Sequence, residues 1–202
     1  MLNKKTIIFL FSLFQQLIIG ETVIAYEQPI YTIEYKNNYY EIRNYNSQIV
    51  AQTNQEKGSN KAFRRLFKYI SGENQSSSKI SMTIPVLQSE KINMTQPILE
   101  SKSEVSSMMQ FFLPTEYKLD EVPTPTNPLV EITVLPSAQY AVVQFNGRSS
   151  DKNFLAHARK LKAKLKEDKI NFLGPHINAT YNGPFTPFFL RKNEIMFRLS
   201  NK

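Results

Sequence analysis

Few side chains in this sequence are of a type that carries out catalysis or binds a metal. There is no Cys, which excludes disulfides, thiolate metal ligands and Cys nucleophiles. The two histidines, His157 and His176, do not form a paired spacing such as His-x-x-x-His. Glu41, Glu131 and Glu194 stand isolated in strand-like segments, and no Gly-x-Ser-x-Gly or phosphate-binding loop occurs. We therefore predict no metal site and no catalytic residues, with carboxylates that meet only in the folded chain as the alternative.

The remaining candidates have ordinary structural interpretations. His157 lies beside the apolar stripe of a predicted helix, so we expect a partly buried structural histidine. His176 follows Gly174 and Pro175, which favour a loop, so we expect it to be exposed. The methionines are expected to fill core space rather than to act as thioether ligands: Met82, Met94, Met108 and Met109.

A first amphipathic helix is predicted over residues 59–72, with Ser59 or Asn60 as N-cap and Gly72 as its C-terminal stop. Apolar residues recur there at helical spacing: Ala62, Phe63, Leu66, Phe67 and Ile70. Arg64, Arg65 and Lys68 flank this stripe. Arg64 and Arg65 cannot share one direction, because adjacent helical residues diverge by about 100°. The Phe side chains fit either the core or the wall of a ligand site, and the basic ones fit either solvent or an anionic ligand.

A second helix is predicted from Asp151 to about Lys166. Its apolar stripe consists of Phe154, Ala158, Leu161 and Leu165. Its other side is basic, with Arg159, Lys160, Lys162, Lys164 and Lys166. We expect this basic side to be solvated, with phosphate or lipid head groups as the alternative partners. No aromatic residue interleaves with it, so no nucleic-acid partner is predicted.

The rest of the chain is expected to form strands and turns. Alternating or β-favouring stretches predict strands at 31–45 (two strands and a turn), 48–53, 79–87, 108–113, 129–135, 139–145, 177–181 and 194–199. Pro85 places one of them at an edge or a bulge, and residues 88–106 are expected to form a hairpin excursion. The order strand, strand, helix, strand, strand occurs twice, over about 31–113 and 129–199, on either side of a proline-rich connector. We predict an internal duplication and an α+β fold with helices on an antiparallel sheet.

Length and composition indicate one globular domain. The 202 residues are 41% hydrophobic and carry a net charge of +8, which favours an anionic partner. Lys4 and Lys5 precede an apolar run from Thr6 to Gly20, and Val23-Ile24-Ala25 resembles a signal-peptidase site. We predict a signal peptide over 1–25, a mature domain over 26–202, and a periplasmic or secreted protein without stable membrane insertion. An uncleaved anchor is the alternative, although the run is shorter than the roughly 20 residues that span a bilayer.

Several separated motifs resemble those of one known family. They are Tyr40-Glu41-Ile42-Arg43-Asn44-Tyr45, the helix from Ala62 to Asn74, Lys79-Ile80-Ser81-Met82-Thr83-Ile84-Pro85-Val86, Ala179-Thr180-Tyr181-Asn182-Gly183-Pro184 and Arg191-Lys192-Asn193-Glu194-Ile195. In order and spacing they resemble the SOUL/heme-binding protein family over nearly the whole mature chain. The resemblance implies a pseudosymmetric, distorted antiparallel β-barrel of duplicated β-β-α-β-β units, flanked by two helices.

The resemblance also implies that heme or a related tetrapyrrole is the ligand, with the protein as its carrier or scavenger. By position, the ligand-binding residues would be Phe63, Arg64, Phe67 and Lys68, in an apolar cleft near the first helix with basic groups for the propionates. Asn44 stands where some family members carry a histidine proposed as axial ligand, and an amide is a poor iron ligand. We expect no axial ligand there. Alternatives are a small-molecule effector-binding module like those of gyrase-inhibitor-like proteins, or an enzyme that modifies a porphyrin.

Overall fold

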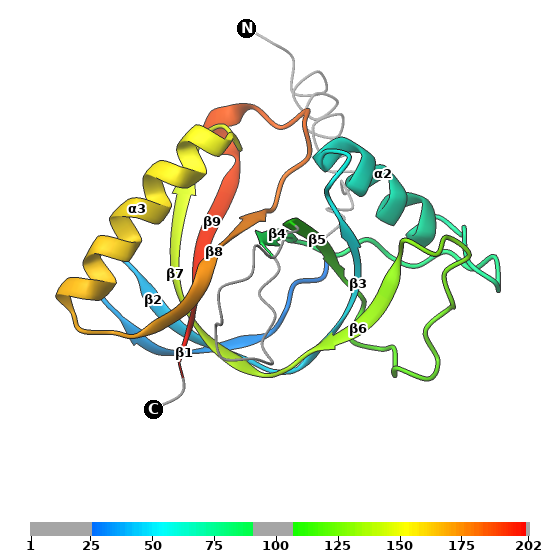
Figure 1. The fold of residues 1–202 in the computed structure, drawn as a ribbon, viewed down its shortest axis with the longest axis horizontal. Coiled ribbons are helices and arrows are strands. Elements are labelled where there is room, and N and C mark those ends of the chain that lie inside the picture. Colours follow the sequence, from blue (N-terminus) through cyan, green and yellow to red (C-terminus); the bar gives the residue numbers. More distant parts are fainter. Residues whose placement is uncertain (1–25, 91–106, 201–202) are drawn as a thin grey trace, which may run out of the picture.

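The computed structural model describes residues 26–90 and 107–200, which form one curled antiparallel sheet with two helices on its outer face (Figure 1). The elements in chain order are β1 (Tyr31–Lys36), β2 (Glu41–Tyr45), β3 (Gln48–Asn54), α2 (Ser59–Ile70), β4 (Val86–Glu90), β5 (Ser107–Phe112), β6 (Glu131–Leu135), β7 (Ala138–Asn146), α3 (Asp151–Glu167), β8 (Phe172–Thr180), the short 3₁₀ helix η1 (Phe188–Leu190) and β9 (Lys192–Leu199). The α+β fold class expected from the sequence is confirmed.

The strand order is symmetrical about the middle of the sheet. The nine strands lie in the order β1-β2-β7-β9-β8-β4-β5-β3-β6, and all pairs are antiparallel. Without β1, the order can be read backwards with β2 exchanged for β6, β3 for β7, β4 for β8 and β5 for β9. This gives the same order again. A duplicated unit packed against its copy would give this order. The duplication itself stays a prediction.

Each helix covers one half of the outer face. The stripe predicted for the second helix is confirmed, since Phe154, Ala158, Leu161 and Leu165 of α3 are buried against strands β7 and β9. On the other half, α2 buries Ala62, Leu66, Tyr69 and Ile70 against β3 and β5. Because alternate residues of a strand point to opposite faces, the other side of the same strands forms a third, concave core. Its members are Val50, Leu87, Phe112, Val142, Ala179, Tyr181 and Met196.

Three local expectations are wrong. Residues 79–85 form no strand, because Pro85 has no N–H to donate and the segment bonds elsewhere: Ile80 N donates to Ile70 O (2.8 Å) and Ile84 N to Glu27 O (2.9 Å). Neither Ser59 nor Asn60 caps α2, whose N-cap is Gly58 at φ 92°. Gly174, at φ 66°, lies at a bulge within β8 rather than in a loop. Most of the expected hairpin excursion, residues 91–106, lies outside the described residues.

Candidate ligand-binding site

The predicted aromatic residues form a pair on the surface of α2. Phe63 and Phe67 are 37% and 47% exposed, and their rings are nearly parallel, with centroids 6.0 Å apart and an interplanar angle of 12°. Phe63 also packs edge-on against Phe111 of β5, with centroids 5.3 Å apart. Of the two alternatives left open for these Phe side chains, the core does not hold, because both stay partly exposed while Tyr69 fills the core and donates its hydroxyl proton to Pro123 O (2.8 Å). The pair therefore leaves aromatic surface of both rings exposed to solvent.

The basic residues of α2 separate as their spacing requires. Arg64 is exposed, whereas Arg65 turns to strand β3 and donates to the hydroxyl of Thr53. Lys68 is exposed and forms an ion pair with Glu73, with Nζ to Oε2 at 3.3 Å. Arg64 lies three residues before Phe67 and four before Lys68, so the three share one side of the helix. Phe63, Arg64, Phe67 and Lys68 thus form one continuous surface, which we call the α2 surface. It is an exposed surface rather than an enclosed cleft.

The concave face of the sheet holds a small cavity. Its volume is about 10 Å³, and its walls include Tyr31, Tyr45, Leu87, Phe112 and Tyr181. The segment before β1 lies across it, since Gln28 and Pro29 belong to the lining and Glu27 bonds to the backbone of Ile84 and Thr115. This volume holds about one water molecule. A tetrapyrrole does not fit there in this conformation.

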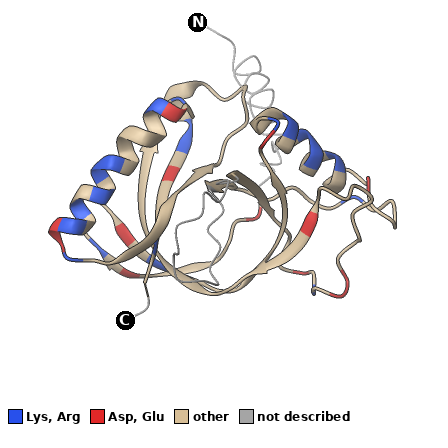
Figure 2. Ribbon diagram, in the orientation of Figure 1, with Lys and Arg blue, Asp and Glu red and all other residues tan. Residues whose placement is uncertain are grey.

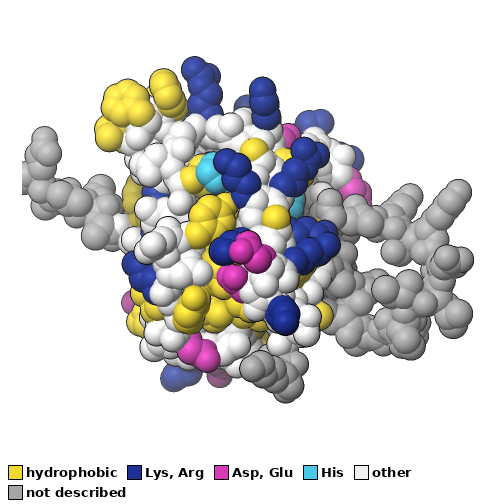
Figure 3. Space-filling model, turned by 90° about the vertical axis from the view of Figure 1, so that its left-hand side faces the viewer, with side chains coloured by type: hydrophobic (Ala, Val, Ile, Leu, Met, Phe, Trp, Pro, Cys, Tyr) yellow, Lys and Arg dark blue, Asp and Glu magenta, His cyan; other side chains and the backbone are white. Residues whose placement is uncertain are grey.

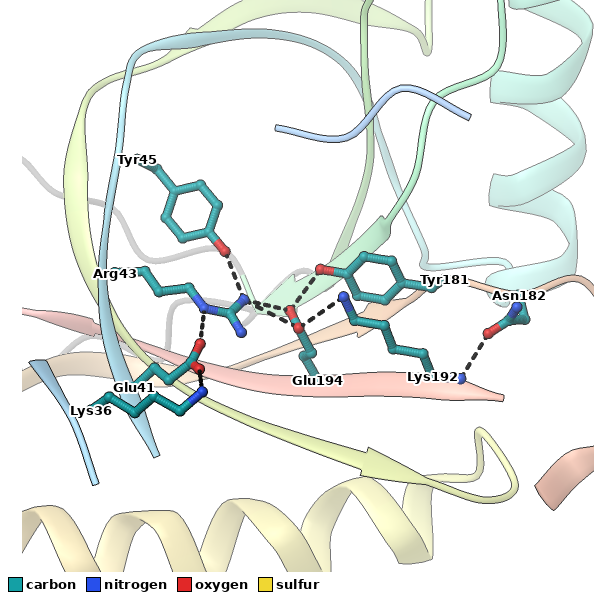
Figure 4. A network of polar contacts seen from close by, with 8 residues as sticks. All are labelled: Lys36, Glu41, Arg43, Tyr45, Tyr181, Asn182, Lys192 and Glu194. Atoms are coloured by element: carbon teal, nitrogen blue, oxygen red, sulfur yellow. Dashed lines mark hydrogen bonds and ion pairs between the residues drawn. The ribbon is translucent and has the colours of Figure 1, made fainter. Parts of the chain in front are cut away.

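A polar network that the sequence did not predict adjoins this cavity (Figure 4). Arg43 of β2 donates to both carboxylate oxygens of Glu194 of β9, at 3.1 and 3.2 Å, and its Nε lies 2.7 Å from Glu41 Oε2. Tyr181 donates to Glu194 at 2.6 Å, and Lys192 Nζ lies 3.3 Å from the same carboxylate. Glu41 and Glu194, which stand isolated in the sequence, therefore meet through Arg43 in the folded chain.

The electrostatics of this network suit a structural role. Burial alone would lower the pKa of Arg43, but Glu194 and the hydroxyl of Tyr45 outweigh it and raise the pKa. Burial and the Glu194 carboxylate raise the pKa of Tyr181, so this hydroxyl stays a hydrogen-bond donor. Each charged group that the network buries thus has an opposite charge or a donor beside it. Such a satisfied network fixes the strands in place.

A period-two signal pointed to part of this network. Glu41, Arg43 and Tyr45 alternate with Ile42 and Asn44, so the three share one face of a strand. The sequence could not show that β9 would lie two strands away from β2, with β7 between them.

Asn44 and the histidines lie away from the α2 surface. Asn44 is on β2, which lies between β1 and β7 in the strand order, and donates to Glu34 Oε2 at 3.0 Å. His157 is half-buried, as expected, and stacks on Phe145 with centroids 3.9 Å apart; burial, and to a lesser extent Lys160, lowers its pKa. His176 lies within β8 and is half-buried beside Phe197, so its assignment to an exposed loop is wrong. Met109 fills core space, as expected.

The solvent side of α3 carries the expected basic cluster (Figures 2 and 3). A shallow hollow of about 290 Å³ lies there, lined by Tyr39, Lys160, Ala163, Lys164 and Glu167. Lys164 is partly neutralised by Glu167, with Nζ to Oε2 at 3.1 Å. Among the residues that the structure describes, no group of three His, Asp or Glu side chains is placed to hold a metal ion. In the same residues, no helix is long and apolar enough to cross a bilayer.

Comparison with known sequences identifies relatives over most of the chain. Residues 26–198 match the family described as SOUL heme-binding protein. Heme-binding protein 1 of Xenopus tropicalis is 27% identical over 146 residues, which cover 72% of this chain and 73% of that protein. Heme-binding protein 1 of Xenopus laevis is 27% identical over 137 residues, or 68% of each chain.

Solved structures share the fold at much lower identity. The C-terminal domain of EcmrR is similar with a TM-score of 0.58 and 9% identity, covering 86% of this chain and 99% of that domain. A protein from Listeria innocua described as a hydrolase is similar with a TM-score of 0.55 and 10% identity, covering 83% and 94% of the two chains. At these identities the similarity concerns the fold alone.

Proposed function

Because the chain belongs to the SOUL heme-binding protein family, we propose that it binds heme or a related tetrapyrrole, and that the α2 surface is where it does so. The observation that carries the location is the parallel, exposed pair of Phe63 and Phe67 beside two exposed cations. A planar macrocycle laid on this pair would remove apolar surface of both partners from water.

The basic part of the α2 surface matches the carboxylates of such a ligand. Arg64 is placed one turn from both Phe67 and Lys68, so a ring on the aromatic pair would bring its propionates near the two cations. Lys68 would have to exchange its bond to Glu73 for one to a propionate, which costs little because both side chains are exposed, at 67% and 44%. These four residues therefore fit a flat, dianionic ligand.

The same residues do not supply an iron ligand. Phe, Arg and Lys side chains of the α2 surface offer no neutral imidazole or thiolate, and Asn44 holds Glu34 on a different strand. The proposed binding therefore depends on the ring face and the propionates. A heme without an axial protein ligand suits cargo better than catalysis, so we propose a carrier or scavenger. With the signal peptide expected over residues 1–25, it would act outside the cytosol.

A paired titration tests this proposal. The chain from Tyr26 onward is titrated with hemin and with metal-free protoporphyrin, following absorbance and fluorescence. We expect saturable binding of both with similar affinity, because the iron makes no bond to the protein. Binding of hemin alone would contradict the absence of an iron ligand, and binding of neither would reject the function.

A gain-of-ligand variant tests the position of residue 44. Asn44→His would introduce an imidazole on β2, which we expect to leave the spectrum of bound hemin unchanged, because residue 44 lies away from the α2 surface. A low-spin shift of the Soret band in the folded variant would place the iron near β2 and overturn the proposed location.

A further inference from the structure

The loop that joins β8 to β9 exposes an unusual amount of aromatic surface. We call residues 182–191 the aromatic loop. Phe185 is 98% exposed, Phe188 49%, Phe189 61% and Leu190 61%. Burying large apolar side chains is normally favourable, and four exposed ones in one short loop leave an apolar tip in water. The proposed tetrapyrrole site uses none of these side chains.

This loop is braced by its own hydrogen bonds. Arg191 donates from Nε to Thr186 O at 2.7 Å and from Nη2 to Pro184 O at 2.6 Å. Two backbone bonds add to this, from Thr186 N to Gly183 O and from Leu190 N to Pro187 O. The rings of Phe188 and Phe189 meet edge to face at 5.6 Å. The aromatic side chains are therefore displayed by a braced loop, so little conformational freedom is lost when they are buried by a partner.

Basic side chains surround the loop. It passes between the first turn of α2 and the first turn of α3 (Figure 1), and hydrophobic side chains project from the corresponding end of the molecule beside Lys and Arg in Figure 3. Arg148 lies over the ring of Phe188, 5.1 Å from its centroid. The exposed charged residues near the two helix starts are the basic Lys57, Lys61, Arg148 and Lys152 and the acidic Glu56 and Asp151. Residues 182–192 contain no acidic residue.

From this geometry we propose that the aromatic loop docks the protein on the surface of a bilayer that contains anionic phospholipid. Phenylalanine and leucine tips on a projecting loop can enter the boundary between head groups and acyl chains, while the surrounding cations contact lipid phosphates. A protein partner would need a groove to receive a tip of this shape, whereas a bilayer yields to it. The proposal does not depend on heme binding, because it uses none of the four residues of the α2 surface.

Vesicle binding tests the proposal directly. The chain from Tyr26 onward contains every described strand and helix, and it lacks the apolar run from Thr6 to Gly20, which would bind lipid by itself. Its partitioning is measured by co-sedimentation with vesicles of phosphatidylcholine and phosphatidylglycerol in equal parts and with phosphatidylcholine alone. We expect stronger binding to the anionic vesicles, weakened by added salt.

The deciding variant is Phe185→Ser with Phe189→Ser, which spares the Phe188 ring under Arg148. We expect it to lower partitioning by about tenfold or more with unchanged thermal unfolding and unchanged hemin binding. Leu119→Ser, a change at a comparably exposed apolar residue of the connector (54%), should leave partitioning unaltered. Equal binding of the double variant and the wild type would overturn the proposal, as would binding that does not distinguish the two lipid mixtures. So would absence of vesicle binding together with dimers that the double variant abolishes, since the loop would then serve a second copy of the chain.

Discussion

The concave face of the sheet and the α2 surface both place aromatic rings beside cations, but only one of them leaves those groups available. On the concave face, Arg43 is 3% exposed and lies within 3.1 Å of Glu41 and Glu194 oxygens. On the α2 surface, the cations are exposed, and Lys68 has one weakly held carboxylate partner in Glu73. Aromatic rings lie beside cations in both places, so the rings do not distinguish them. The difference is that close carboxylates already neutralise the cation of the structural cluster, whereas the cations of the α2 surface are available to an anionic ligand.

The largest effect is expected on the concave face. Arg43→Met should lower the free energy of unfolding by about 3 to 5 kcal/mol, because it leaves the Glu194 carboxylate buried without its main counter-charge. Urea unfolding followed by circular dichroism measures this. The control is Lys118→Met, which breaks the exposed pair with Glu121 and should change little. A loss no larger than that of the control would show that the network does not hold the strands together.

On the α2 surface the large effect should fall on binding instead. Phe63→Ala with Phe67→Ala should weaken hemin binding by about 3 kcal/mol, since the apolar platform is lost, with less effect on unfolding than Arg43→Met. Titration of the variant beside Leu155→Ala, an exposed leucine of α3 (43%), gives the comparison. If both variants bind hemin like the wild type, the aromatic pair is not the site.

A smaller effect should come from the cations. Lys68→Glu should weaken binding of the dicarboxylate porphyrin by about 1 to 3 kcal/mol, because a propionate loses its charged partner. Glu73→Gln should act in the opposite direction, since it releases Lys68 from its ion pair. Fluorescence titration with metal-free protoporphyrin measures both. Unchanged affinity in Lys68→Glu would remove Lys68 from the site.

The smallest expected effect is on the free energy of unfolding at acidic pH. Burial alone would raise the pKa of Glu41, but hydrogen bonds from Lys36 and Arg43 outweigh it and hold the pKa below its ordinary value of 4.5. A depressed carboxyl pKa stabilises the fold above the unfolded-state pKa, and this contribution disappears as the pH falls through the folded-state value. Unfolding free energies measured from pH 6 downward should therefore decline below about pH 4.5, and decline less in Glu41→Gln. An identical pH dependence in both would assign the acid sensitivity elsewhere.

Local sequence pattern predicted most of the helices and strands, but only part of the candidate site. Periodicity located both helices, and the stripe of α3 was buried as expected. For α2 the same periodicity put Phe63 and Phe67 on the apolar stripe but left open whether they face the core, and in the structure Tyr69 is buried while both Phe rings stay partly exposed. Helical spacing gives an angle around the axis, but how far a neighbouring strand covers that angle depends on the packing of β3 and β5. The four residues chosen by resemblance are contiguous on α2 for the simple reason that one turn of helix joins them.

What the sequence could not predict depends on pairing between distant strands. Arg43 and Glu194 are 151 residues apart, and only the order of β2, β7 and β9 brings them together. Likewise, Pro85 signalled an irregularity but not that residues 79–85 would bond to α2 and to Glu27 instead of joining the sheet.

The place of β9 in the sheet has a consequence for biosynthesis. This strand is the last of the described strands in chain order, yet it lies between β7 and β8 and contributes Glu194 to the buried network. While the ribosome is still adding residues, β7 and β8 have no strand between them, and Arg43 has no Glu194 to meet. The sheet can therefore close only after β9 has been synthesised, so that the growing polypeptide stays open and accessible to chaperones until then.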